Sequence, residues 1–198
     1  EINFKAGQYL MIKIPTDKGP VSRLYSIASP NTVKNGFELI IGIIPGGLAS
    51  NYLFSLKEKT EVVFQGPAGM FGLKENNEPK IFLTTGTGIA PVKSMLESYQ
   101  LPVSSYSLFW GLKTYKDIYL FDELKEFNLK ICLSREQNLD MITENDRKYF
   151  ELGRVDSYCP LLTTADYYLC GGRQIVESLR RFLVAKNVPK ENIYFEKF

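Results

Sequence analysis

The stretch IFLTTGTGIAPVKSMLESY, residues 81–99, has the pattern of one unit of a parallel α/β fold. Residues 81–85 form a short apolar run typical of a buried strand, and residues 89–99 have helical spacing. The turn between them contains Gly86 and Gly88, which tolerate positive φ angles and close approach of other backbone. Such a turn presents free N–H groups and the positive end of a helix dipole to a phosphate. The stretch therefore indicates a nucleotide-binding, doubly wound sheet.

The same turn departs from the usual dinucleotide-binding fingerprint. Pro91 stands where a third glycine is expected, and the next strand runs into Trp110-Gly111 instead of ending in an acidic residue. A ribose must therefore be recognised in another way. A lone glycine-rich turn is also compatible with a plain strand–helix connection that binds nothing.

The chain downstream of this unit continues to alternate between strand and helix patterns. This alternation predicts a Rossmann-like parallel sheet with helices on both faces for residues 77–198, after a polar boundary at residues 74–79. Strands are expected at residues 106–110, 129–133, 167–170 and 193–195, and helices at residues 122–127 and 174–187.

The chain upstream of the boundary has the punctuation of an antiparallel β domain. Short apolar runs end in Pro, Gly or Asn, which predicts a small antiparallel barrel over residues 1–76. The chain starts with Glu1 inside an apparently structured segment, so we expect native material before it and a barrel that lacks its first strands. The expected strands are residues 8–14, 23–28, 37–44 and 61–65, with a short helix at residues 48–56.

The overall composition is that of an ordinary globular protein. The 198 residues are 44% apolar and 23% charged, with a formal net charge of +2. We expect no affinity for nucleic acid, because there is no basic block, and no membrane span, because no apolar run approaches about 18 residues. The three widely spaced cysteines indicate reduced thiols, and hence a cytoplasmic location.

The chain contains no histidine. This excludes Ser-His-Asp and Cys-His catalysis, which need an imidazole base, and also His-ligated metal sites. Three cysteines are too few to hold an iron–sulfur cluster, and we expect no metal site. Enzymatic chemistry in this protein must then come from an organic cofactor.

Two candidate sites lie in the first half of the chain. Arg23, Tyr25 and Ser26 combine a cation, a flat aromatic ring and a hydroxyl on one predicted strand, which suits a planar phosphorylated ligand. An ordinary exposed strand face is the alternative. The glycine pair before Ser50 is a second phosphate site, unless Ser50 serves only as a helix N-cap.

Three more candidates lie in the second half. Cys170 ends a predicted strand at the edge where ligands bind in such sheets, although a buried cysteine is often only a small hydrophobe. Ser134 and Arg135 offer a hydroxyl and a guanidinium to an adenosine phosphate, or form a solvated loop. Glu196 and Phe198 place an acid and an aromatic ring at the chain end, where fraying is common.

The order of these motifs resembles that of the ferredoxin–NADP(+) reductase superfamily, and the resemblance covers nearly the whole chain. It implies an FAD-binding antiparallel barrel, an NAD(P)-binding α/β domain and hydride exchange between nicotinamide C4 and flavin N5. The motifs are Arg23-Leu24-Tyr25-Ser26, Gly47-Leu48-Ala49-Ser50, Gly66-Pro67-Ala68-Gly69, Gly86 to Pro91, Cys170-Gly171-Gly172 and Glu196-Lys197-Phe198.

The resemblance also implies residue roles on the flavin side. Arg23 holds the pyrophosphate, Tyr25 lies against the isoalloxazine and Ser26 hydrogen-bonds near N5. Ser50 takes the remaining phosphate charge, and Phe198 covers the second face of the ring. Ile27, Gly47, Leu48 and Ala49 complete the expected contacts.

On the nicotinamide side, the resemblance places Cys170 beside C4 and Glu196 in a polar network with Ser26. Catalysis is thus assigned to Ser26, Cys170 and Glu196. Dinucleotide contacts are expected from Gly86, Thr87, Gly88, Ser134, Arg135 and Gly171.

The implied function is electron transfer from NAD(P)H through FAD to a protein acceptor, such as a ferredoxin, a flavodoxin or an oxygenase component. One alternative is a reductase of free flavin or a ferric chelate. Another is a nucleotide-binding module without catalysis. The coenzyme also stays open, because residues 134–137 resemble the segment that reads the 2′-phosphate in plant-type members, whereas residues 150–155 resemble NADH-using relatives.

Overall fold

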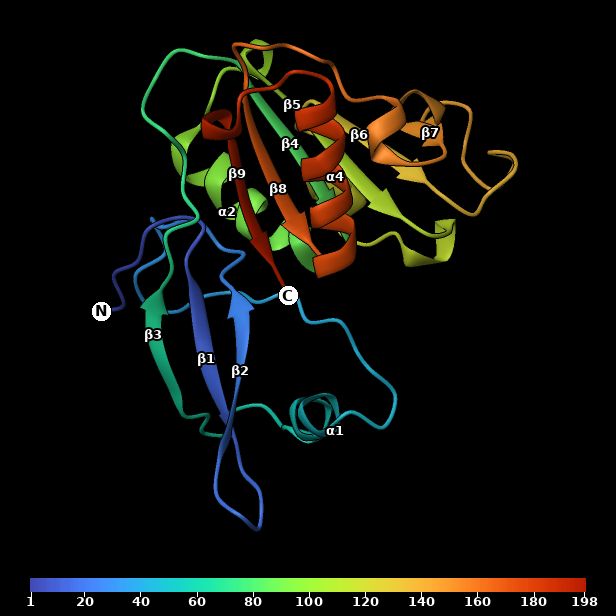
Figure 1. The fold of residues 1–198 in the computed structure, drawn as a ribbon. Helices are drawn as coiled ribbons and strands as arrows, with labels where there is room; N and C mark the ends of the chain where they lie inside the picture. The colour runs from blue at the N-terminus through green and yellow to red at the C-terminus, as the bar shows by residue number, and fades with distance from the viewer.

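The computed structural model describes all residues, 1–198. The protein contains two sheets that lie end to end (Figure 1). The first is an antiparallel sheet with the strand order β2-β1-β3, which is open at both edges. Helix α1 contacts β1 and lies at the end away from the second sheet (Figure 1). The elements of this half are β1 (Tyr9–Ile14), β2 (Val21–Ser26), α1 (Leu48–Ser55) and β3 (Phe64–Ala68).

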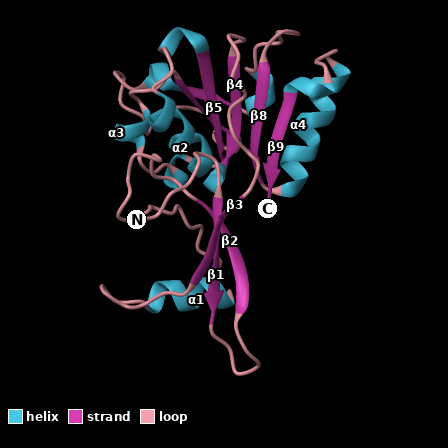
Figure 2. Ribbon diagram, turned by 90° about the vertical axis from the view of Figure 1, so that its left-hand side faces the viewer, coloured by secondary structure: helices cyan, strands magenta, loops and turns pink.

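The second sheet has six parallel strands in the order β7-β6-β5-β4-β8-β9. Helix α2 packs on one face and α4 on the other, each over its own apolar cluster (Figure 2). An antiparallel sheet followed by a doubly wound parallel sheet confirms the predicted two-part fold. The elements are β4 (Lys80–Thr85), α2 (Ile89–Tyr99), β5 (Tyr106–Leu112), α3 (Phe121–Leu124), β6 (Leu129–Leu133), β7 (Phe150–Leu152), β8 (Asp166–Gly171), α4 (Arg173–Ala185) and β9 (Ile193–Lys197).

The central strands are buried because helices cover both of their faces. Every residue of β8 is buried, and so are all but the last of β4. Short 3₁₀ turns connect several of the strands and helices. None of the helices combines the length and apolar character needed to cross a membrane.

The two sheets are joined by packing and by hydrogen bonds. Phe71, which follows the first sheet, belongs to the same apolar cluster as Met95 of α2. Ser94 Oγ, also on α2, donates to the carbonyl of Ser29 over 2.7 Å in a buried position. The two halves therefore meet through a shared core, which fixes the residues at the end of β2 relative to the parallel sheet.

The strand predicted at residues 37–44 is wrong. Its backbone pairing is limited to an isolated bridge between Leu39 and Ile27 and to the Glu38 carbonyl, which accepts from the N–H of Ala28 over 2.8 Å. The apolar residues Ile40 and Ile41 instead line a cavity over the parallel sheet. These two residues are therefore apolar because they cover a cavity, and not because they belong to a strand.

Other expected elements are present with shifted ends. The strand expected at residues 61–65 begins at Phe64 and continues through Pro67, which is tolerated because β3 is an edge strand. The helix expected at residues 122–127 is the single turn α3. Strand β7 has only three residues, too few to give a readable pattern, and was missed.

Candidate functional site

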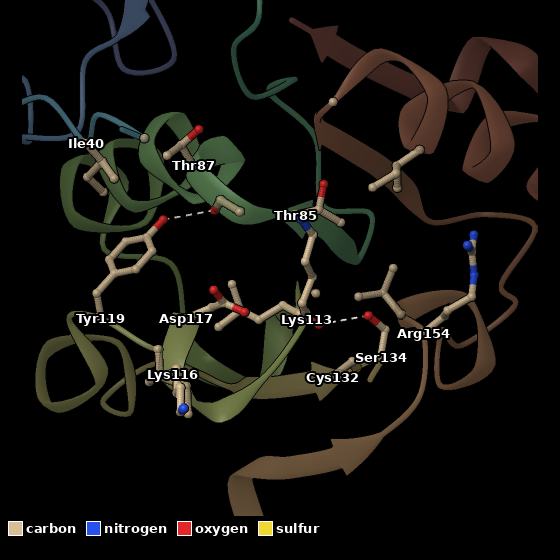
Figure 3. Close-up of a pocket in the computed structure, with 18 of the residues that line it drawn as sticks. Ile40, Thr85, Thr87, Lys113, Lys116, Asp117, Tyr119, Cys132, Ser134 and Arg154 are labelled. Carbon is tan, nitrogen blue, oxygen red and sulfur yellow. Dashed lines mark hydrogen bonds between the residues drawn. The ribbon is translucent and has the colours of Figure 1, made fainter. Parts of the chain in front are cut away.

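A cavity of about 750 Å³ lies at the carboxyl ends of the parallel strands (Figure 3). This volume is within the usual range of small-molecule and cofactor sites, and the position is where open α/β sheets bind ligands. Its lining residues are Ile40, Ile41, Gly42, Thr85, Gly86, Thr87, Gly111, Leu112, Lys113, Lys116, Asp117, Ile118, Tyr119, Cys132, Ser134, Gly153, Arg154, Val155, Gly172, Ile175 and Phe198.

The glycine-rich turn after β4 forms one wall of the cavity. Gly86 has a φ of +52° and no neighbouring atom within 4 Å of the place where a Cβ would lie, so it leaves open space toward a ligand. Gly88 is buried against the end of β8, where a Cβ would lie 2.5 Å from the carbonyl carbon of Cys170. The structure thus brings together two motifs more than eighty residues apart in sequence.

Ser26, Cys170 and Glu196 meet where the end of β2 reaches the parallel sheet. Ser26 Oγ donates to Glu196 Oε2 over 3.0 Å. Glu196 on β9 is the register partner of Cys170 on β8. This places the three expected catalytic residues in one group, and the chain end lies close to the top of β2 in Figure 1.

Burial determines the protonation states of Cys170 and Glu196. It raises the pKa of the Cys170 thiol well above its ordinary value, and the nearby Glu196 raises it further, so the thiol is neutral at physiological pH. Burial also raises the pKa of Glu196, although the hydrogen bond from Ser26 acts in the opposite direction. Glu196 therefore keeps a proton to a higher pH than an ordinary glutamate does.

Arg23 and Tyr25 lie on β2, where both side chains can reach a ligand. Arg23 is exposed, and its Nη1 donates to the carbonyl of Ser22 over 2.9 Å. Tyr25 is half-buried; burial raises its pKa, and Arg23 lowers it. Ile27 is fully buried and belongs to the small apolar cluster beneath this sheet. Two residues apart on one strand, Arg23 and Tyr25 share a face.

The start of α1 does not have the alternative arrangement in which Ser50 caps the helix. The N-cap is Gly47, and no side chain caps the helix, so Ser50 is not an N-cap. Ser50 is buried, and its Oγ accepts a hydrogen bond from the N–H of Ile44 over 2.8 Å. Because no side chain fills the cap, the first N–H groups at Leu48 and Ala49 are left for another acceptor. This group does not line the cavity.

Phe198 is held in place, which argues against a frayed chain end. Its N–H donates to the carbonyl of Gly171 over 3.2 Å, and its carbonyl accepts from the N–H of Arg173 over 3.0 Å. The ring lines the cavity and is 57% exposed. A planar ligand at the end of β8 therefore has an aromatic surface next to it.

The cations of the cavity were largely missed by sequence reasoning. Ser134 lines the cavity, and its Oγ donates to the carbonyl of Leu112 over 3.1 Å, whereas Arg135 is exposed and outside the lining. Lys113 and Arg154 do line it (Figure 3). Lys113 directly follows β5, so the strand-end rule that selected Ser134 could also have found it.

The chemistry of these residues fits two nucleotide cofactors. An open glycine turn and the cations Lys113, Lys116 and Arg154 suit the phosphates of a dinucleotide, and the apolar walls suit its rings. Arg23 and Tyr25 offer a cation and an aromatic ring to a second planar, phosphorylated molecule. A hydrogen bond between Ser26 and Glu196 links the two halves of the molecule.

Each half of the chain matches a family of its own. Residues 1–72 match the family described as oxidoreductase FAD-binding domain. Residues 82–181, about half of the chain, match the family described as oxidoreductase NAD-binding domain.

Among individual proteins, the toluate 1,2-dioxygenase electron transfer component of Pseudomonas putida is 31% identical and is matched over 100% of this chain and 60% of its own length. The cytochrome P450 reductase GcoB of Amycolatopsis superposes with a TM-score of 0.87 at 24% identity, covering 100% of this chain and 62% of that one. A ferredoxin NADP+ reductase from Neisseria gonorrhoeae with bound FAD and NADP gives 0.78 at 20% identity, covering 98% and 87%. The chain thus spans about 60% of the length of the curated relatives that it matches first.

Proposed function

This chain belongs to the ferredoxin–NADP(+) reductase superfamily, and we propose that it transfers a hydride from NAD(P)H to FAD and passes the electrons to a protein acceptor. The observation that carries the proposal is the hydrogen bond from Ser26 to Glu196, beside Cys170. It joins the FAD-binding half to the NAD-binding half, and Phe198, two residues after Glu196, lines the cavity. No histidine is needed, because the cofactors supply the hydride chemistry.

The flavin side of the proposal rests on β2 and α1. FAD, when bound, accepts a hydride as an electron pair and releases the electrons singly. Arg23 would hold its pyrophosphate through charge-assisted hydrogen bonds, and Tyr25 would pack against its ring. Ser50 holds the turn before α1 through its hydrogen bond with Ile44, and the free N–H groups of Leu48 and Ala49 would take the remaining phosphate charge.

The nicotinamide side rests on the turns after β4 and β8. Thr87 and the open backbone at Gly86 would bind the dinucleotide, while Gly88 and Gly171 allow the two turns to pack closely. The neutral thiol of Cys170 would pack against the nicotinamide, orient it and exclude water.

At the reacting centre, Ser26 donates its single hydroxyl proton to Glu196 over 3.0 Å, and this hydrogen bond keeps the Ser26 oxygen oriented. That oxygen would accept a hydrogen bond from the flavin. Phe198 would shield the opposite face of the ring. These residues would therefore position the reacting atoms and exclude water from them.

The proposed electron acceptor rests on the names of the relatives. Several are electron transfer or reductase components of oxygenases, such as the toluate 1,2-dioxygenase component. We therefore propose a ferredoxin, a flavodoxin or an oxygenase component as the acceptor. We also propose a domain boundary between residues 76 and 77, and a cytoplasmic location supported by three buried cysteines that form no disulfide.

The proposal is tested with the purified chain loaded with FAD under anaerobic conditions. We expect NADH or NADPH to bleach the flavin absorbance, and a [2Fe–2S] ferredoxin or a flavodoxin to restore it. Loss of colour on purification and no bleaching with either coenzyme would favour a non-catalytic nucleotide-binding module. Reoxidation by free flavin or ferric citrate, but by no protein acceptor, would favour the small-molecule reductase.

Coenzyme choice is tested by comparing two arginines. Arg135 is exposed, follows Ser134 in the chain and is outside the cavity lining, whereas Arg154 lines the cavity itself. We expect Arg135→Ala to lower kcat/KM for NADPH about tenfold, as loss of a hydrogen bond to a charged group does, and to leave NADH nearly unchanged. Arg154→Ala serves as the comparison and should lower kcat/KM for both. An equal fall for both coenzymes in Arg135→Ala would remove Arg135 from this role.

A further inference from the structure

The carbonyl of Gly86 is anchored by two aromatic side chains from outside its own turn. Trp110 Nε1 donates to it over 2.9 Å, and the Tyr119 hydroxyl donates to it over 3.0 Å (Figure 3). The N–H of Ile89 also donates to it and closes the 3₁₀ turn. One backbone oxygen is thus held from β5, from the segment after β5 and from its own turn.

The two aromatic residues form a rigid unit. Trp110 is fully buried on β5, and its ring packs edge-to-face against Tyr119 with the centroids 4.8 Å apart. Burial raises the pKa of Tyr119, so its hydroxyl stays neutral and remains a donor. The buried indole N–H of Trp110 is costly to leave without an acceptor, and the half-buried Tyr119 hydroxyl shares that acceptor, so the Trp110 bond in particular resists opening.

Anchoring the carbonyl also fixes the next N–H group. In a trans peptide the C=O and the following N–H point in opposite directions, so the direction of the Gly86 carbonyl sets that of the Thr87 N–H. Gly86 has a φ of +52°, and a glycine moves easily between positive and negative φ. Without anchors, this peptide would sample several directions at the wall of the cavity.

We propose that Trp110 and Tyr119 are positioning residues that preorganise the Gly86–Thr87 peptide for the dinucleotide. The proposal rests on the assignment of this cavity to NAD(P)H. Preorganisation removes an ordering cost from binding, so these residues act on dinucleotide affinity without needing to touch the reacting atoms. A purely structural role would change the stability of the protein and leave the affinity of the folded site unchanged.

The experiment measures NAD+ and NADP+ binding to the FAD-loaded protein by titration calorimetry, without turnover. We expect Tyr119→Phe, which keeps the ring and removes the donor, to raise Kd about three- to tenfold, in line with one neutral hydrogen bond. Trp110→Phe should act in the same direction. Tyr167→Phe is the matched control, because the Tyr167 hydroxyl also donates to a backbone carbonyl, that of Pro160 over 2.9 Å, outside the cavity.

Amide hydrogen exchange gives a second readout. In the nucleotide-free protein, a peptide covering residues 84–90 should exchange faster in Tyr119→Phe and in Trp110→Phe than in the wild type or in Tyr167→Phe. FAD affinity should stay within about twofold of wild type in all variants, since the anchored turn lies in the NAD-binding half.

The outcomes separate this inference from the proposed function. If the wild type binds neither NAD+ nor NADP+, the assignment of the cavity fails, and the inference fails with it. If the wild type binds and both aromatic variants bind equally well, with unchanged exchange, the positioning role is overturned while the assignment stands. A lowered Tm with unchanged Kd would likewise show that the two residues only stabilise the fold.

Discussion

Glu196→Ala is expected to slow flavin reduction at saturating nucleotide about 100-fold, because misplacement of reacting atoms by about 1 Å costs that much. Glu196 holds the Ser26 hydroxyl at 3.0 Å and lies beside Cys170 in the sheet register. Removing the carboxyl frees the hydroxyl and opens a space at the junction of the two halves. Cys170→Ala should slow the same step through loss of the wall against the nicotinamide. In both variants nucleotide binding should change less than the rate.

The rate is measured by anaerobic stopped-flow mixing of the FAD-loaded protein with NADH and with NADPH. Glu177→Ala is the matched control, because Glu177 is a partly exposed carboxylate that pairs with Lys197, the residue after Glu196, over 2.7 Å. It should reduce flavin at the wild-type rate. Wild-type limiting rates in both Glu196→Ala and Cys170→Ala would mean that the two residues are structural.

A conservative variant distinguishes two roles of Glu196, which are to orient Ser26 and to carry a proton. Because burial raises the pKa of Glu196, any pH dependence that this carboxyl confers lies above the range of an ordinary glutamate. Glu196→Gln keeps an oxygen that can accept from Ser26 but cannot titrate. It should therefore retain most of the rate, and the pH dependence should disappear.

The parts of the site that the sequence predicted are those at the ends of strands. Helix α2 has the predicted bounds, Ile89–Tyr99, since a glycine turn and helical spacing define its start and its face. Cys170 and Ser134 were selected because parallel strands present their carboxyl ends at one edge, and only Ser134 lines the cavity directly. Such rules need only local pattern and strand direction, both of which can be read from a single sequence.

The parts that were missed depend on long-range packing. Ile40 looked like a strand residue, yet it lines the cavity together with Ile175 of α4. Hydrophobicity alone cannot separate a residue that packs in the core from one that covers a ligand. Tyr119 lies in a connection without periodicity, and only its hydrogen bond to Gly86 shows its place.

Gly88→Ala is expected to destabilise the protein by about 1–3 kcal/mol, the usual cost of overpacking. The added Cβ would lie 2.5 Å from the carbonyl carbon of Cys170 and 2.8 Å from the nitrogen of Gly171. Both are backbone atoms at the end of the fully buried strand β8, so no side-chain rotation can relieve the collision. For a chain of this size the loss corresponds to a Tm lowered by roughly 3–10 °C.

Thermal unfolding of the FAD-loaded protein, followed by circular dichroism, measures this effect. Gly36→Ala is the control, because no atom lies within 4 Å of the place where its Cβ would stand, and its Tm should match the wild type. An unchanged Tm in Gly88→Ala would show that the turns after β4 and β8 can separate without cost. If the collision is instead relieved by moving the turn at Thr87 away from β8, dinucleotide affinity must fall together with Tm, because the same turn forms the wall of the cavity.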